Sequence, residues 1–155
     1  MDWYQIIKTI HIISSTVLFG TGAGIAFFMY RSQFTEDVSK KYYAIQNTVL
    51  ADYLFIFPAV LIQPLSGFWL ILHGGYNWTD SWLMVSYALY IVAGLCWISV
   101  VWIQIQLKNI LAVSIEQGTE LPERYHKLFK LWLILGWPAF IGLIVIFFLM
   151  VFKPV

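Results

Sequence analysis

Two residues near the start of the chain have the types and the spacing for chemistry. His11 lies within an apolar run that begins at Thr9, and an ionisable side chain in such a run is costly unless it has a function. Lys8 precedes it by three residues, so both side chains lie on one face of a helix. A neutral imidazole can bind a haem iron, and a lysine beside it can pair with a carboxylate of the porphyrin. The alternatives are a histidine bonded to a neighbouring helix and a lysine that reaches the membrane interface.

His73 is the second candidate ligand. If the second apolar segment crosses the membrane antiparallel to the first, its end meets the start of the first. At about 1.5 Å per residue, His11 then lies roughly 12 Å past Trp3, and His73 roughly 7.5 Å short of Trp78. Two imidazoles at similar depth on facing helices can hold a haem iron from both sides. We therefore predict haem b as the cofactor, with His11 and His73 as the metal ligands. A histidine hydrated near the lipid headgroups is the alternative for His73.

Three further residues complete the predicted cofactor site. Ser15 and Gly22 continue the face of His11 at helical spacing, and a small residue there leaves room for a flat ligand. Gln63 precedes Pro64 in the middle of the second segment. Its amide could bond a ligand or quinone oxygen, or it could satisfy a backbone carbonyl that a proline leaves free.

The apolar segments that carry these residues are long enough to cross a membrane. The chain has 155 residues, of which 61% are hydrophobic and 11% are charged, whereas soluble domains average about 25% charged residues. Residues 9–30, 53–79, 81–107 and 131–152 contain no Asp, Glu, Lys or Arg, and a spanning helix needs roughly 20 apolar residues. We predict one all-α domain over residues 1–155, a four-helix transmembrane bundle with spans at 4–30, 53–76, 81–107 and 130–152.

The basic residues predict the orientation of this bundle. Most of them fall in the two longer loops, namely Arg31, Lys40, Lys41, Lys108, Arg124, Lys127 and Lys130. The positive-inside rule makes these loops cytoplasmic and puts both termini on the outer side of a bacterial inner membrane. The first of the two loops contains helix formers and is predicted to continue as helix beyond the membrane. Asp52 would then lie at the cytoplasmic mouth, near a helix start where negative charge is favoured.

Small residues and prolines predict how the helices pack. Gly20 and Gly24 form the small-residue spacing that allows close helix contact, so they could join two copies of the chain. Pro58 and Pro64 predict a bend in the second helix. The predicted surrounding is the lipid bilayer. A net charge of +1 gives no reason to expect a nucleic-acid partner.

Three stretches carry a resemblance to known families: KTIHIISSTVLFGTGAGIAFFM, FPAVLIQPLSGFWLI and LWLILGWPAF…FLMVFKP. They resemble a bacterial family of small integral membrane proteins of unknown function over nearly the whole chain. The chain is more distantly similar to the four-helix haem-binding protoporphyrinogen oxidase family, whose first-helix Lys-x-x-His is matched by Lys8 and His11. This resemblance implies haem binding by His11. The third-helix lysine and histidine of that family have no counterpart in WLMVSYALYIVAGLCW, which leaves His73 as the replacement ligand.

These observations support three hypotheses of function. The first is a b-type haem protein that serves electron transfer or a small membrane oxidoreductase reaction, with a quinone, a porphyrin or a membrane redox protein as partner. The second is a non-catalytic assembly factor or complex subunit of the membrane. The third is protoporphyrinogen oxidation. Hydrolytic catalysis has no support, because the spans contain neither paired carboxylates nor a nucleophile beside a base.

Overall fold

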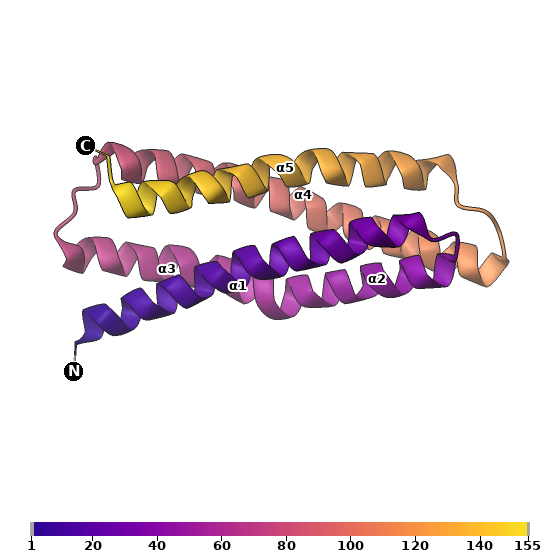
Figure 1. The fold of residues 1–155 in the computed structure, drawn as a ribbon, viewed down its shortest axis with the longest axis horizontal. Coiled ribbons are helices and arrows are strands. Elements are labelled where there is room, and N and C mark those ends of the chain that lie inside the picture. Colours follow the sequence, from indigo (N-terminus) through magenta and orange to yellow (C-terminus); the bar gives the residue numbers. More distant parts are fainter. Residues whose placement is uncertain (1, 155) are drawn as a thin grey trace.

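The computed structural model describes residues 2–154 as an elongated bundle of helices (Figure 1). The helices are α1 (Trp3–Arg31), α2 (Val38–Ala51), α3 (Phe57–Gly74), α4 (Ser81–Gln117) and α5 (Glu123–Phe152). A short 3-10 turn, Ser32–Phe34, follows α1, and a π-helical turn, Asp52–Ile56, joins α2 to α3. Both ends of the chain lie at the same end of the bundle (Figure 1).

Four helical segments of the described chain are long and apolar enough to cross a membrane. They are Trp3–Phe34, Val38–Gly74, Ser81–Gln117 and Glu123–Phe152. This confirms the prediction of an all-α fold with four spanning helices. The helices extend beyond the predicted spans, because their charged ends also favour helix. The 37 residues of α4 would measure about 55 Å, against a hydrocarbon core of about 30 Å.

The first long loop is largely helical, as predicted. Its helix, α2, begins at Val38, where Asp37 accepts hydrogen bonds from the backbone N–H groups of Ser39 and Lys40 at 2.9 and 3.3 Å. The helix then runs without interruption into the second span. The placement of Asp52 near a helix start is therefore wrong, because the capping residue lies 15 positions earlier in the chain (Asp37 against Asp52).

The junction of α2 and α3 is the main irregularity in the spanning helices. The N–H of Phe57 donates to the carbonyl of Asp52, five residues back, in place of the usual four. Pro58 follows directly and has no N–H, so the carbonyl four residues before it loses its α-helical partner. The irregular turn thus lies just before Pro58, and α3 continues through Pro64 as helix. Figure 1 shows the offset of the chain at this junction.

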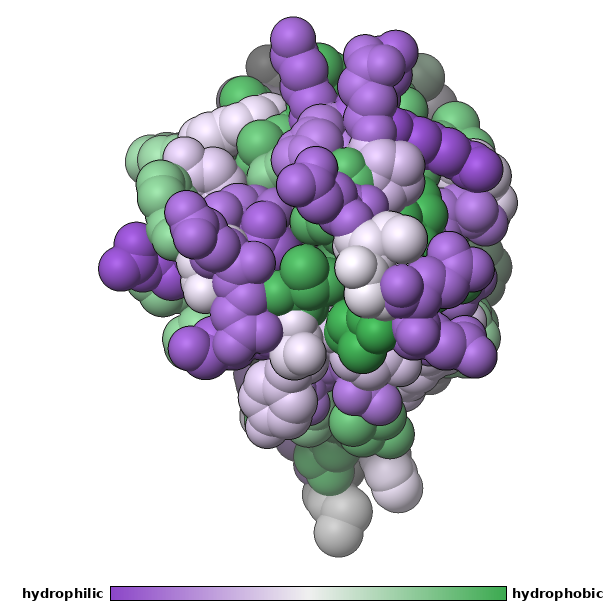
Figure 2. All heavy atoms as spheres, turned by 90° about the vertical axis from the view of Figure 1, so that its right-hand side faces the viewer, coloured by the Kyte–Doolittle hydropathy of each residue, from purple (hydrophilic) through white to green (hydrophobic). Residues whose placement is uncertain are grey.

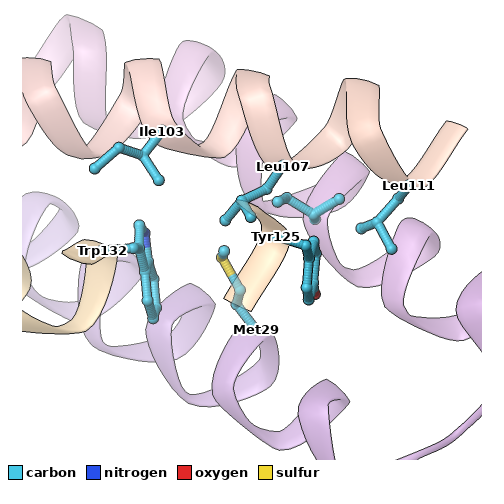
Figure 3. Packing of buried hydrophobic residues seen from close by; sticks show 7 residues of the cluster. Met29, Ile103, Leu107, Leu111, Tyr125 and Trp132 are labelled. Atoms are coloured by element: carbon cyan, nitrogen blue, oxygen red, sulfur yellow. The ribbon is translucent and has the colours of Figure 1, made fainter. Parts of the chain in front are cut away.

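The helices pack in pairs around two apolar clusters. Helix α1 packs on α3, α4 packs on α5, and α2 packs on α4. The larger cluster lies at the end away from the termini (Figure 3) and consists of Met29, Ile45, Ile103, Leu107, Leu111, Tyr125 and Trp132. The smaller cluster lies near the termini and consists of Ile71, Trp82 and Leu83. The extra residue of the π turn rotates α3 relative to α2 by about 100°, so that α2 faces α4 while α3 faces α1.

Candidate functional site

The imidazole of His11 is bonded to a serine on the neighbouring helix. His11 Nδ1 lies 2.8 Å from Ser66 Oγ, across the contact between α1 and α3. The Ser66 hydroxyl also lies within hydrogen-bond distance of two carbonyls of its own helix, those of Ile62 at 2.6 Å and Gln63 at 3.2 Å. When Ser66 donates to one of these carbonyls, it accepts from His11, and Nδ1 carries the imidazole proton. The other ring nitrogen, Nε2, is then left with a free lone pair.

Helix α3 also holds the backbone and the ring edge of His11. The side-chain amide of Gln63 donates to the His11 carbonyl at 2.7 Å. A Cβ atom at Gly67 would lie 3.3 Å from His11 Cε1, so the absence of a side chain there gives the ring its place. Gln63 thus bonds a carbonyl of another helix rather than one that a proline has freed, and its bond to a ligand oxygen stays a prediction.

Ser15 and Gly22 do not join the contacts of His11. The hydroxyl of Ser15 bonds the Ile12 carbonyl of its own helix at 2.7 Å. Its neighbour Ser14 is the buried serine, and it donates to the Ala59 carbonyl of α3 at 3.2 Å. Successive residues of a helix point about 100° apart, so a choice between adjacent serines depends on the exact rotation of α1.

Gly22 instead borders an apolar cavity in the middle of the bundle. The cavity has a volume of about 90 Å³ and lies between all four spanning segments. A Cβ at Gly22 would contact the ring of Phe140 at 3.5 Å. Gly22 follows His11 by 11 positions, which correspond to roughly 16 Å of helix. The structure therefore separates this glycine from the histidine that it was predicted to accompany.

His73 has its own partners near the end of α3. Its Nδ1 lies 2.9 Å from the Trp69 carbonyl and donates there, which leaves Nε2 outside this contact. Its ring stacks on the Trp69 indole at a centroid distance of 4.0 Å and is exposed. His73 follows Ser66, the partner of His11, by seven residues, or about 10.5 Å along the helix. The two imidazoles lie at the same end of the bundle, but they share no partner.

Lys8 is exposed at this end of the bundle. It lies close enough to Tyr76 to interact electrostatically with the phenol group. Tyr76 also receives a hydrogen bond from the ammonium group of Lys153, which lies over its ring at 4.4 Å. Both lysines of the termini and the hydroxyl of Tyr76 therefore form a polar group at the edge of the spanning region.

A buried carboxyl group is the feature that the sequence-based reading missed. Asp52 is only 2% exposed, and its Oδ1 accepts a hydrogen bond from the indole N–H of Trp97 on α4 at 3.1 Å. The one signal in the sequence is the pair Trp97 and Gln104. Their spacing of seven residues puts two hydrogen-bonding side chains on one face of an otherwise apolar helix.

Within residues 2–154, no three His, Cys, Asp or Glu side chains are grouped to hold a metal ion. The chemistry available near His11 is therefore that of single imidazole nitrogens. Each of the two histidines at this end presents one unprotonated nitrogen, which can act as a ligand or as a hydrogen-bond acceptor.

The chain belongs to the family described as predicted integral membrane protein (DUF2269), which matches residues 5–154. This confirms the predicted resemblance to a family of integral membrane proteins of unknown function. No curated protein and no solved structure matches the chain. The family match carries no link to the protoporphyrinogen oxidase family, so that distant resemblance stays a prediction.

Proposed function

Proceeding from membership in this family of integral membrane proteins, we propose that the protein is a b-type haem protein for electron transfer or a small membrane oxidoreductase reaction. The observation that carries the proposal is the contact between His11 Nδ1 and Ser66 Oγ at 2.8 Å. In the tautomer in which Nδ1 donates to Ser66, Nε2 keeps the lone pair that an iron ligand requires. Histidines that bind metals commonly donate their second nitrogen in this way, which fixes the ring and raises its basicity.

The residues at this end of the bundle fit a haem group in three respects. His11 supplies a preoriented nitrogen, and His73 supplies a second unprotonated nitrogen as candidate for the other axial position. Lys8 is exposed nearby and can pair with a propionate. Bound haem would supply one-electron chemistry at its iron, and the protein would orient it and exclude water.

The central cavity at Gly22 is not the proposed haem site. Its volume is about 90 Å³, whereas pockets for small molecules typically measure about 300–1,000 Å³. The proposed position is therefore the surface formed by α1 and α3 around His11. Lipid or a second copy of the chain would cover the outer face of the porphyrin there.

The test is the absorption spectrum of the detergent-purified protein, oxidised and then reduced with dithionite. We expect a Soret band and sharp reduced α and β bands, with loss of haem in His11→Ala. His126→Ala is the matched control, because His126 is exposed at the other end of the bundle. Full haem occupancy in His73→Ala would leave His11 as the one axial ligand from this chain. A flat spectrum after haem is supplied during expression would refute the proposal.

A second candidate function is a non-catalytic membrane subunit or assembly factor. The observation that favours it is the set of bonds around His11, because Gln63, Ser66 and Gly67 would also hold a purely structural histidine. On this reading the purified protein is colourless and copurifies in a stable complex with defined membrane partners. His11→Asn would then preserve the complex, whereas a haem protein would lose its colour.

The orientation and location belong to the same proposal: both termini outside, in a bacterial inner membrane. The support is the distribution of charge. Hydrophilic side chains gather at the end of the bundle opposite the termini (Figure 2), where Arg31, Lys41 and Lys127 are found. The positive-inside rule assigns such an end to the cytoplasm. A reporter enzyme that is active only outside the cytoplasm should therefore be active when it is fused to the C-terminus.

A further inference from the structure

The carboxyl group of Asp52 lies inside the bundle without a positively charged partner. Its side chain is 2% exposed, and only Oδ1 has a donor, the indole N–H of Trp97 at 3.1 Å. The other oxygen, Oδ2, is buried and has no hydrogen-bond partner. A carboxylate in a water-poor interior is so costly without a partner that the group commonly takes up a proton instead.

Gln104 is the second polar group of this site. It is also 2% exposed, and its side-chain N–H group acts on Asp52 as a donor, in a contact outside normal hydrogen-bond geometry. Its oxygen, Oε1, is buried and has no donor. Two neighbouring side chains thus each present an acceptor oxygen that lacks a proton donor. A half-turn of the amide about its last bond exchanges its oxygen and nitrogen and brings Oε1 next to the carboxyl group.

No side chain in the described chain neutralises Asp52 by charge. Its environment consists of burial and the side chains of Trp97 and Gln104, and no cation from α1, α4 or α5 acts on it. The two ion pairs found within residues 2–154 join Lys40 to Asp37 and Lys127 to Glu123, both on the surface. The negative charge of Asp52 is then neutralised by a bound proton.

We propose that Asp52 and Gln104 form a proton-binding site inside the membrane bundle, in which Asp52 is a neutral carboxylic acid. Its Oδ2–H donates to Gln104 Oε1, while Oδ1 keeps the bond from Trp97. One proton from water therefore satisfies both orphaned oxygens and removes the buried charge. Asp52 continues the buried face of α2, after Ile45 and Thr48, and it begins a π-helical turn, a feature that is frequent at functional sites. The inference does not depend on haem.

Infrared spectroscopy of the lipid-embedded protein tests the site at neutral pH, because a protonated carboxyl group has its own C=O stretch. The chain contains eight acidic residues. The other seven, Asp2, Glu36, Asp37, Asp80, Glu116, Glu120 and Glu123, are exposed or half-buried, so Asp52 is the buried one of the eight. A carboxylic acid band from the wild-type protein, shifted in D₂O, is therefore expected from Asp52 alone.

Two variants and one control complete the test. Asp52→Asn should abolish the band and keep the fold, because its amide can accept from Trp97 and donate to Gln104 as the neutral acid does. Gln104→Leu should move the band to higher frequency, because the carboxylic acid of Asp52 then loses the hydrogen-bond acceptor of its O–H group. Glu120→Gln is the control at an exposed position, and it should change neither the intensity nor the frequency of the band. Should Asp52→Asn fail to fold, the wild-type spectrum alone still decides.

The contrary result is equally definite. Absence of the acid band at neutral pH, with a carboxylate band that Asp52→Asn removes, would overturn the proposal. Asp52 would then be an ionised group held by neutral donors or by a bridging water.

Discussion

His11 Nδ1 and Ser66 Oγ lie 2.8 Å apart and join the first spanning helix to the second. The serine hydroxyl is bonded to the Ile62 carbonyl of its own helix at 2.6 Å. When the serine donates to this carbonyl, the imidazole is the donor and the serine the acceptor of the interhelical bond. The same contact then stabilises the α1–α3 pair and leaves Nε2 free for a ligand.

Removal of this acceptor should weaken the helix pair. Ser66→Ala is expected to lower the free energy of unfolding by about 0.6 kcal/mol, the average for an interhelical hydrogen bond in a membrane. The measurement is unfolding of the detergent-solubilised protein in a denaturing detergent. Ser15→Ala is the control, because Ser15 bonds only within α1. Equal losses from both variants would contradict the assigned contact.

The same variant should also change the chemistry of His11. Without Ser66 the imidazole is free to change its tautomer and turn. If haem is bound, we expect Ser66→Ala to lower its affinity by roughly 10- to 100-fold, as the loss of a supporting partner of a metal-binding histidine does. Titration of the apoprotein with haem measures this. An unchanged affinity would separate the Ser66 bond from ligand binding.

Gly67 should tolerate no side chain. A Cβ at this position would lie 3.3 Å from His11 Cε1, so a larger residue must displace the ring. Gly67→Val is expected to destabilise the protein by about 1–3 kcal/mol, the usual range for overpacking. Gly136→Val is the matched control, because a Cβ at Gly136 meets nothing within 4 Å. Thermal unfolding of the two variants should therefore diverge.

Removal of the Trp97 indole N–H should lower the free energy of unfolding, because Asp52 then loses its hydrogen-bond donor. Trp97→Phe keeps the aromatic ring but leaves Asp52 without its 3.1 Å hydrogen bond. The expected destabilisation is about 1–3 kcal/mol, the cost of an unsatisfied buried polar group. Trp137→Phe serves as the control, since Trp137 is 67% exposed. If Trp97→Phe were as stable as this control, Oδ1 would have another donor.

Gly20 and Gly24 are open in the single chain, where a Cβ at either position meets nothing within 4 Å. The small-residue spacing is thus available to a second copy. If the chain forms a dimer through this face, Gly20→Leu and Gly24→Leu should each shift it toward monomer in a detergent sedimentation experiment. Gly136→Leu should leave the distribution unchanged. A wild-type protein that is monomeric at every concentration would exclude this interface.

The sequence alone determined the fold class, because uncharged apolar runs longer than a bilayer core have helix as their available structure. It also identified His11 as a candidate functional residue, since an ionisable side chain within an apolar span is costly unless it has a role. The helical character of the first long loop followed from its composition. None of these conclusions requires knowing which residues of different helices meet.

Only the tertiary structure decided the contacts. The choice of Ser14 over Ser15, the partnership of His11 with Ser66 and Gly67, and the burial of Asp52 all depend on helix rotation. The periodicity of an amphipathic helix normally reveals that rotation, but a helix that is apolar all round carries little of this signal. The π turn separates α2, which packs on α4, from α3, which packs on α1. Asp52 looks peripheral in the chain, but it lies in the interior because it continues the buried face of α2, after Ile45 and Thr48.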